Sequence, residues 1–216
     1  YWVQSTMMPL QNQQGDTVRY LSLRTEVTRQ VELRSGLEAL ALADADAPFS
    51  DIVQAVGAAL HAQSVGIVRC APDDAEAQVL AQWRPGLSPP PLAYRLQGTP
   101  LAVTLRNAAP TLHIIENPWR AFPDAQGFVL PTASTYYAVA LRDRGGEVCG
   151  ALYVQDARAR AQFDTESALL MVAAVKATAA ILRAADRRRL EESEARLRTL
   201  VNNAPVGVFM TDVSGA

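Results

Sequence analysis

The sequence is poor in cysteine and histidine, with two of each among 216 residues. Cys70 and Cys149 lie far apart along the chain, so they offer no disulfide framework, and such sparse cysteine is typical of a reducing compartment. His61 and His113 do not stand at metal-ligand spacing from each other or from the cysteines. We therefore expect no metal site and a cytoplasmic location.

An excess of charge of one sign is also missing. The 20 basic and 22 acidic residues give a net charge of −2, and the arginines at 187–189 are followed directly by acidic residues at 191, 192 and 194. Such a surface offers no strong field for nucleic acid or anionic lipid. The longest apolar run, ALLMVAAV at 168–175, is too short to span a bilayer. We expect neither a nucleic-acid partner nor a membrane segment here.

Motifs of catalysis are lacking as well. Gly145 and Gly146 are placed by the pattern in a hairpin turn rather than in a phosphate-binding loop. The sequence contains neither a kinase phospho-acceptor helix nor the signature motifs of enzymes that make or degrade cyclic-di-GMP. We expect no catalytic residues in this segment, and any output activity to lie outside it.

The N-terminal part changes from a β to a helical pattern without a loop. Residues 1–25 alternate apolar and polar side chains around the turn QNQQGD and predict a β-hairpin. From residue 29 a helical period follows, with Leu33, Leu37 and Leu40 in phase and Thr28 as the N-cap. The SGLE sequence around Gly36 leaves a break open, although one helix is favoured. The chain begins without methionine in an apparent strand, so we expect a segment of a longer polypeptide.

The central part reads as a second helix followed by short strands and connections. A helix is predicted over 49–62, and Thr99 followed by Pro100 predicts the start of a short helix. The adjacent Gly145 and Gly146 suit a tight hairpin between the last two strands. Strands are predicted at 64–70, 77–83, 92–97, 111–116, 134–142 and 147–155.

A long helix is predicted from residue 164 to at least residue 185. One apolar stripe contains Leu170, Ala174, Ala177 and Ile181, and a second contains Met171, Val175, Thr178 and Leu182. Two such stripes are typical of a helix with a wide core face. They are also typical of a helix that packs one stripe on the sheet and the other on a partner. Beyond residue 186 the helix is highly charged and retains Leu190, Leu197 and Leu200, a short coiled-coil pattern.

The order of elements and three motifs resemble a GAF domain over residues 47–185. The motifs are GTPLAVTLRNAAP, ALRDRGGEVCGALYV and RAQFDTESALLMVAA. The resemblance implies an α+β fold with a central antiparallel sheet, helices packed on it, and long terminal helices that form a bundle or dimer interface.

The flanks resemble parts of PAS domains. Residues 1–28 resemble the closing hairpin, or PAC region, of one PAS domain, and residues 198–216 resemble the start of another, with helical linkers at 29–46 and 186–197. The resemblance implies that Glu26, Val27 and Thr28 form a junction that links strand and helix and carries a signal. The residues alone allow a simpler interpretation, in which Thr28 is an N-cap and Glu26 a favourable charge near a helix N-terminus.

Ligand binding is a further implication of the GAF resemblance, between the sheet and the short-helix region. The aromatic and polar side chains there suit a small planar ligand, or fill the space themselves. A covalently bound bilin is disfavoured because Ala71 and Gly150 follow the two cysteines. A cyclic nucleotide is disfavoured because the signature of GAF domains that bind one is not evident. Haem bound through His113 is disfavoured as well. The candidate ligand-binding residues are Trp83, Tyr94, His113, Trp119, Phe122, Phe128 and Tyr136, with Tyr137 as the alternative to Tyr136.

The GAF and PAS resemblances imply a non-catalytic sensor or relay segment of a bacterial-type receptor, which binds an unidentified small molecule and signals through its flanking helices. The expected output domains are a histidine kinase or an enzyme of cyclic-di-GMP signalling, and the expected partner is a second copy in a parallel homodimer. The dimer helix would use Met171, Val175, Leu182, Leu190 and Leu197. Two alternatives are a ligand-free dimerisation spacer and a small-molecule redox enzyme, which requires Cys70 or Cys149 to be exposed with a depressed pKa.

Overall fold

The computed structural model describes residues 2–11, 17–42, 49–71, 73–86, 92–107, 113–125, 127–158 and 164–202. At its centre is a six-stranded antiparallel sheet with the strand order β5-β4-β3-β8-β7-β6. The strands are β3 (Ser64–Arg69), β4 (Glu76–Trp83), β5 (Ala93–Arg95), β6 (His113–Glu116), β7 (Thr135–Arg142) and β8 (Val148–Asp156). This arrangement confirms the predicted α+β fold.

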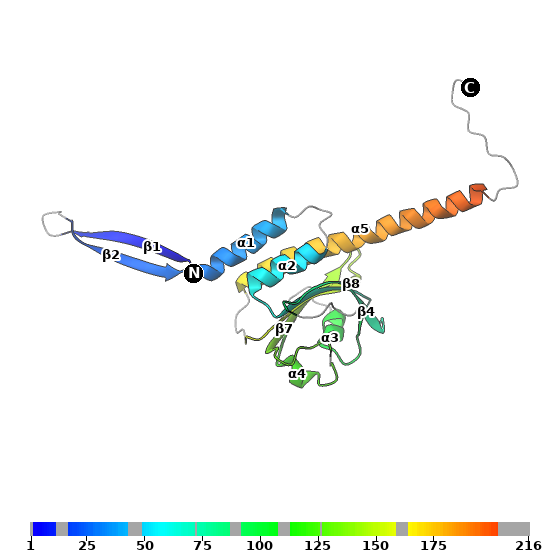
Figure 1. Ribbon diagram of the computed structural model, residues 1–216, viewed down its shortest axis with the longest axis horizontal. Helices are drawn as coiled ribbons and strands as arrows, with labels where there is room; N and C mark the ends of the chain where they lie inside the picture. Colours follow the sequence, from blue (N-terminus) through cyan, green and yellow to red (C-terminus); the bar gives the residue numbers. More distant parts are fainter. Residues whose placement is uncertain are drawn as a thin grey trace, which may run out of the picture.

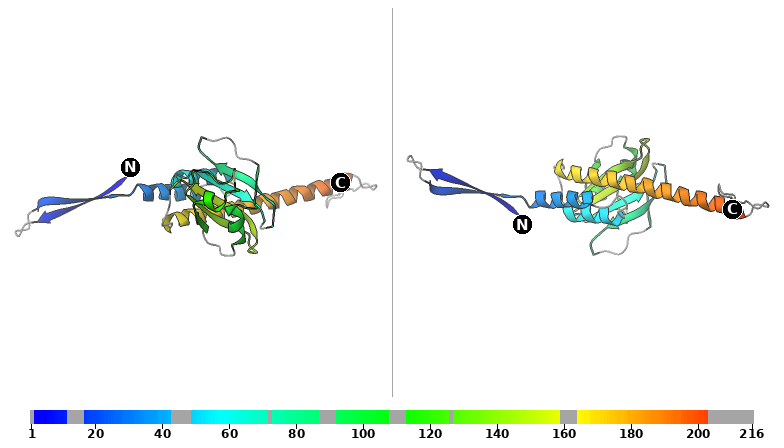
Figure 2. Two further views of the ribbon diagram at one scale, coloured as in Figure 1. Left: turned by 90° about the horizontal axis from the view of Figure 1, so that it is seen from below. Right: turned by 90° about the horizontal axis from the view of Figure 1, so that it is seen from above.

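Three helices lie on one side of the sheet, two packed on its strands and the N-terminal one packed on those two (Figures 1 and 2). They are α1 (Thr28–Leu42), α2 (Phe49–Leu60) and α5 (Asp164–Asn202), and α1 continues through Gly36 without a break. The apolar period of α2 buries Ile52, Val56 and Leu60 against the sheet. Two shorter helices, α3 (Pro100–Arg106) and α4 (Pro118–Ala121), lie on the opposite side of the sheet. The sheet therefore has a core on both faces, which explains why β7 is buried along almost its whole length.

The predicted N-terminal hairpin is formed by β1 (Val3–Gln11) and β2 (Thr17–Glu26), and it projects away from the rest of the chain (Figure 1). Each apolar side chain described on it is exposed, including Met8, Leu21 and Leu23. The turn at 12–16 and the part of the PAS-like segment after residue 202 lie outside the described residues.

Two β-bulges change which side chains face which core. The pairing of β3 with β4 shifts between Ile67 and Val68, so that Leu80 is an extra residue in β4. The pairing of β7 with β8 shifts between Leu141 and Arg142, and Cys149 is the extra residue there. A bulge interrupts strict alternation, so side chains beyond it swap faces relative to the sequence pattern.

Local signals in the sequence set two of the connections. The Thr99 hydroxyl accepts a hydrogen bond from the Ala102 backbone N–H at 3.3 Å, and Pro100 begins α3, as predicted. In the β7–β8 turn, Gly146 has φ +86°, whereas Gly145 does not adopt a positive φ. The Asp143 carboxylate accepts from the backbone N–H groups of Gly145 and Glu147, which closes the turn.

One helix in the described part of the chain passes a length and composition test for a membrane span. It is the segment Glu166–Val201, which contains an 18-residue window of mean hydropathy 1.8. Leu169, Leu170 and Ala173 of this helix are buried against the core of the sheet. The helix therefore owes part of its apolar character to packing within the domain.

Candidate functional site

Three tyrosines surround Phe128 on the face of the sheet that carries α3. Tyr94 comes from β5, Tyr136 from β7 and Tyr153 from β8, and all four rings are buried in one core. The Phe128 ring centroid lies 5.0 Å from that of Tyr94, 4.9 Å from that of Tyr153 and 6.1 Å from that of Tyr136. These edge-on or tilted contacts are the geometry that aromatic pairs prefer. We call Tyr94, Tyr136 and Tyr153 the tyrosine box.

A half-buried amide connects two phenols of the box. The Gln82 side-chain NH₂ donates to the Tyr153 hydroxyl and to the Ser64 hydroxyl, each at 3.0 Å, and the Tyr94 hydroxyl donates to the Gln82 carbonyl oxygen at 3.0 Å. Burial raises the pKa of Tyr136 and of Tyr153. The box therefore presents neutral hydrogen-bonding groups at neutral pH, which suits recognition better than acid–base catalysis.

An open groove of about 600 Å³ adjoins the box, a volume in the range of small-molecule sites. Tyr94 and Phe128 form part of its wall, and the exposed Arg95 and Asp124 also line it. Its lining residues are Ala93, Tyr94, Arg95, Gln97, Gly98, Thr99, Asp124, Ala125, Gly127 and Phe128.

The structure brings together only part of the predicted ligand-binding set. Tyr94, Phe128 and Tyr136 meet in one core, and the half-buried Trp119 and Phe122 pack against the same core. Tyr137, the alternative to Tyr136, faces the helices instead.

Trp83 and His113 do not join this group. Trp83 packs on α2 on the opposite face, where a Cβ added to Gly57 would lie 2.3 Å from its ring. The bulge at Leu80 is the reason, because it turns Trp83 towards the helices and Gln82 towards the tyrosines. His113 begins β6, and its side chain lies outside the described part of the chain.

Sequence reasoning missed Tyr153 and Gln82. Tyr153 alternates with Ala151 along β8, and both face the α3 side, so the strand pattern contained a signal for it. Gly66 lies under the Tyr153 ring, where a Cβ would come within 2.4 Å of ring carbon Cζ. A glycine at that position in β3 lets the tyrosine lie flat on the sheet.

Neither cysteine has the environment of a reactive thiol. Cys70 is 4% exposed, and burial, with smaller contributions from Asp74 and Cys149, raises its pKa to about 12. Burial also raises the pKa of Cys149, whose thiol donates to the Leu141 carbonyl at 3.4 Å. The redox alternative requires an exposed thiol with a depressed pKa, and the raised pKa values of Cys70 and Cys149 do not favour it. In the described ranges no three His, Cys, Asp or Glu residues are grouped to hold a metal ion.

The junction between β2 and α1 is held by a small hydrogen-bond group. The Thr28 hydroxyl donates to the Glu26 carboxylate at 3.3 Å and accepts from the Trp2 backbone N–H at 2.9 Å. The Val27 backbone N–H donates to the Trp2 carbonyl at 3.0 Å. Both strands of the hairpin are thus tied to the start of α1. One residue further on, Arg29 forms an ion pair with Glu166 of α5.

The two apolar stripes of α5 have different environments. Leu170, Ala174, Ala177 and Ile181 are buried, whereas Val175 in the second stripe is 67% exposed. Of the other residues expected on the dimer helix, Met171, Leu190 and Leu197 are exposed and Leu182 is half-buried. The second stripe is therefore not part of a wide core face in the single chain.

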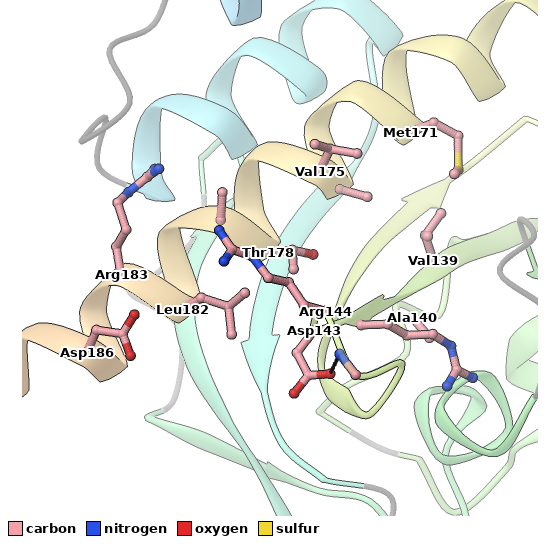
Figure 3. Close-up of a pocket in the computed structure, with 14 residues that line it drawn as sticks. Val139, Ala140, Asp143, Arg144, Met171, Val175, Thr178, Leu182, Arg183 and Asp186 are labelled. Atoms are coloured by element: carbon pink, nitrogen blue, oxygen red, sulfur yellow. Dashed lines mark hydrogen bonds between the residues drawn. The ribbon is translucent and has the colours of Figure 1, made fainter. Parts of the chain in front are cut away.

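A groove of about 590 Å³ runs between this exposed stripe and the β7–β8 turn (Figure 3). Met171, Val175 and Leu182 line it from α5, and Asp143 and Arg144 line it from the turn. All three predicted dimer residues within the domain therefore belong to one hollowed, mainly apolar surface.

Comparison with protein-family models gives no match, and comparison with curated proteins gives none either. Solved structures do match. The GAF domain of a phosphoenolpyruvate-protein phosphotransferase from Acinetobacter has a TM-score of 0.54 and 16% identity, over 76% of this chain and 99% of that one. The GAF domain of a phosphoenolpyruvate-protein phosphotransferase from Coxiella burnetii has a TM-score of 0.53 and 14% identity. The match covers 76% of this chain and 98% of that one. The chain therefore has a GAF fold.

An enzyme has this fold as well. The free methionine-R-sulfoxide reductase from Neisseria meningitidis, solved with its substrate, matches with a TM-score of 0.51 and 13% identity, over 70% of this chain and 89% of that one. At such identities the likeness concerns the fold alone, so the chemistry has to be argued from this chain's own residues.

Proposed function

We propose that this chain is a non-catalytic relay module of GAF type, which forms a parallel homodimer along α5 and transmits conformational change between its N-terminal hairpin and its C-terminal helix. The observation that carries the proposal is the exposed apolar stripe of α5. Met171, Val175 and Leu182 lie in it within the domain, and the exposed Leu190 and Leu197 follow on the same helix beyond Asp186. An exposed apolar stripe beside the core-facing stripe is typical of a helix that packs on a partner.

Charge supports a parallel pair in register. If Leu190 and Leu197 occupy the a positions of a heptad, Ser193 and Leu200 occupy d, Arg189 occupies g and Glu194 occupies e of the next heptad. In a parallel dimer each Arg189 then faces Glu194 of the second copy, which gives two symmetric ion pairs. Arg189 and Glu194 are both exposed on the single chain and accessible for such pairing.

A continuous set of contacts supports transmission. The hairpin is bonded to the start of α1 through Thr28, and Arg29 connects α1 to Glu166 at the start of α5. Helices joined without a flexible loop pass on displacement rather than absorb it. In this proposal the segment works in the cytoplasm between two PAS modules of a bacterial-type receptor, and the output domain lies elsewhere.

The test is the oligomeric state of the whole chain by native mass spectrometry. We expect a dimer that Val175→Asp and Leu190→Asp convert to monomer, because each places a charge in the apolar stripe. Val103→Asp is the matched control, since Val103 is an exposed valine on α3, on the other side of the sheet. Leu190→Cys should form an interchain disulfide with itself under mild oxidation. A monomeric parent chain, or a dimer that survives both stripe variants, would overturn the proposal.

A second candidate function is sensing of a small planar molecule. The specific observation in its favour is the 600 Å³ groove that opens beside Tyr94 and Phe128. Native mass spectrometry of chain purified from cells tests this function in the same experiment. A reproducible adduct that is lost on Tyr94→Ala would support the sensor, and an adduct-free protein would favour the spacer alternative.

A further inference from the structure

Phe128 differs from the three tyrosines around it because it does not come from a strand or helix. It lies in the segment between α4 and β7, while the three tyrosines of the box stand on β5, β7 and β8. All three tyrosine rings contact it, and its own ring is 3% exposed. The box thus surrounds a single phenyl ring on three sides.

The backbone at Phe128 is held by a few polar contacts. The Gln155 side-chain NH₂ donates to the Phe128 carbonyl at 2.8 Å, and the Leu130 backbone N–H donates to the Gln155 side-chain oxygen at 2.7 Å. The Phe128 backbone N–H donates to the Ala125 carbonyl at 3.2 Å. Gly127, directly before it, has φ +87° and is exposed, so the backbone here has freedom that other residues lack.

There is space into which the ring can move. The 600 Å³ groove is lined by both Gly127 and Phe128, so the segment that holds the ring forms a wall between the box and open solvent. A rotation about Gly127 would carry the ring out of the box and into this groove. The box would then be open without any change in its three strands.

We infer that Phe128 is an internal occupant of an aromatic ligand site, and that an uncharged planar ligand of about one ring displaces it from the tyrosine box. This inference rests on the second candidate function, and it names the ligand class and the residue that controls access. The ring contacts favour an aromatic body. The phenols of Tyr94 and Tyr153 and the amide of Gln82 favour one polar substituent, and as neutral groups they favour an uncharged one.

The first experiment uses phenol as the probe and isothermal titration of the whole chain. We expect Phe128→Ala to bind phenol at least tenfold more tightly than the parent chain. Leu152→Ala, which opens the helix-side core at an equally buried position, is the matched control and should not show this gain. We also expect Phe128→Ala to prefer phenol to benzene, since the hydroxyl can join the Gln82 network.

Two results would overturn the inference. One is a folded Phe128→Ala chain that binds phenol no more tightly than the parent or the Leu152→Ala control. The other concerns the parent chain at saturating phenol, where displacement of Phe128 should speed hydrogen exchange of the Leu130 amide but not of the β7 amides. Unchanged exchange at Leu130 would contradict displacement. If Phe128→Ala does not fold, Phe128→Leu serves in its place.

The outcomes separate this inference from the proposed functions. One outcome is a native adduct that is lost on Tyr94→Ala, together with phenol binding that is unchanged in Phe128→Ala. This outcome would support the sensor function and reject the proposed role of Phe128. Another outcome is tighter phenol binding by Phe128→Ala with no native adduct on the parent chain. This outcome would support the ligand site and reject the sensor function. The dimer test on α5 is independent of both.

Discussion

The guanidinium of Arg29 at the start of α1 is paired with the carboxylate of Glu166 in the first turn of α5. Glu166 is buried, whereas the Arg29 side chain is half-exposed. The helix that enters the domain and the helix that leaves it are therefore tied together at one end, directly after the junction with the hairpin.

We expect Glu166→Gln to lower the free energy of unfolding by about 1 to 2 kcal/mol, because a charge-assisted hydrogen bond is replaced by a neutral one next to a half-solvated arginine. Urea unfolding measures the change. Glu38→Gln is the control, since Glu38 pairs with Arg34 at 2.8 Å on the exposed surface of α1 and should cost less than about 0.5 kcal/mol. Equal effects of the two variants would contradict a special role for Glu166.

We expect Thr28→Val to loosen the junction between hairpin and helix. The hydroxyl that bonds Glu26 and the Trp2 amide is lost while the shape of the side chain is kept, at a cost of about 1 kcal/mol. Hydrogen exchange should become faster at the Trp2 and Val27 amides. Thr6→Val, on the exposed surface of β1, should leave those amides unchanged. Unchanged exchange in Thr28→Val would show that the hydroxyl does not hold the junction.

We expect Gly150→Ala to destabilise the domain by about 2 to 3 kcal/mol. A Cβ at Gly150 would lie 2.2 Å from the Val68 carbonyl oxygen, so two strands at the centre of the sheet would have to move apart. Gly145→Ala, in the turn of the same hairpin, meets only the Asp143 carboxylate at 3.3 Å and should cost far less. Thermal unfolding measures the loss of stability in each of the two variants. A loss in Gly150→Ala as small as that in Gly145→Ala would mean that β3 and β8 can move apart at little cost.

We expect stability to fall as pH rises from about 9 towards 12. The pKa of Cys70 is raised from 9.0 to about 12, so the folded state keeps a proton that the unfolded state releases above pH 9. The stability that Cys70 contributes is complete below pH 9 and is lost through this interval. Urea unfolding measures the free energy of unfolding at pH 8 and at pH 9.5. The decrease between these two pH values should be smaller for Cys70→Ala than for the parent chain. The same slope in both would argue against a buried protonated thiol.

Most secondary structure was predictable because it depends on local period and on single residues. The helical phase of Ile52, Val56 and Leu60 placed α2, and Thr99 with Pro100 placed the start of α3. Exposure of the second α5 stripe was not predictable, because apolar residues at helical spacing look alike whether they face a core, a partner or solvent.

The candidate site was predictable only where strand alternation is unbroken. Tyr94 and Tyr136 lie in one core, although the sequence left Tyr136 and Tyr137 as alternatives, whereas Trp83 lies on the opposite face because an extra residue at Leu80 reverses the alternation of β4. The same bulge brings Gln82 to the tyrosines. Bulges depend on pairing with a distant strand, and nothing in the local sequence of β4 reveals one.

The length of α5 has a mechanical consequence. At 39 residues it is a rod of about 58 Å, of which the part after residue 185 extends beyond the sheet for about 25 Å. If the domain-bound half tilts by about 5°, the free tip sweeps about 2 Å, roughly the scale of the helix shifts that accompany switching at interfaces. The displacement caused by a small tilt near Arg29 and Glu166 therefore grows with distance along α5. It is largest at the C-terminal end of the helix, where a downstream domain would follow.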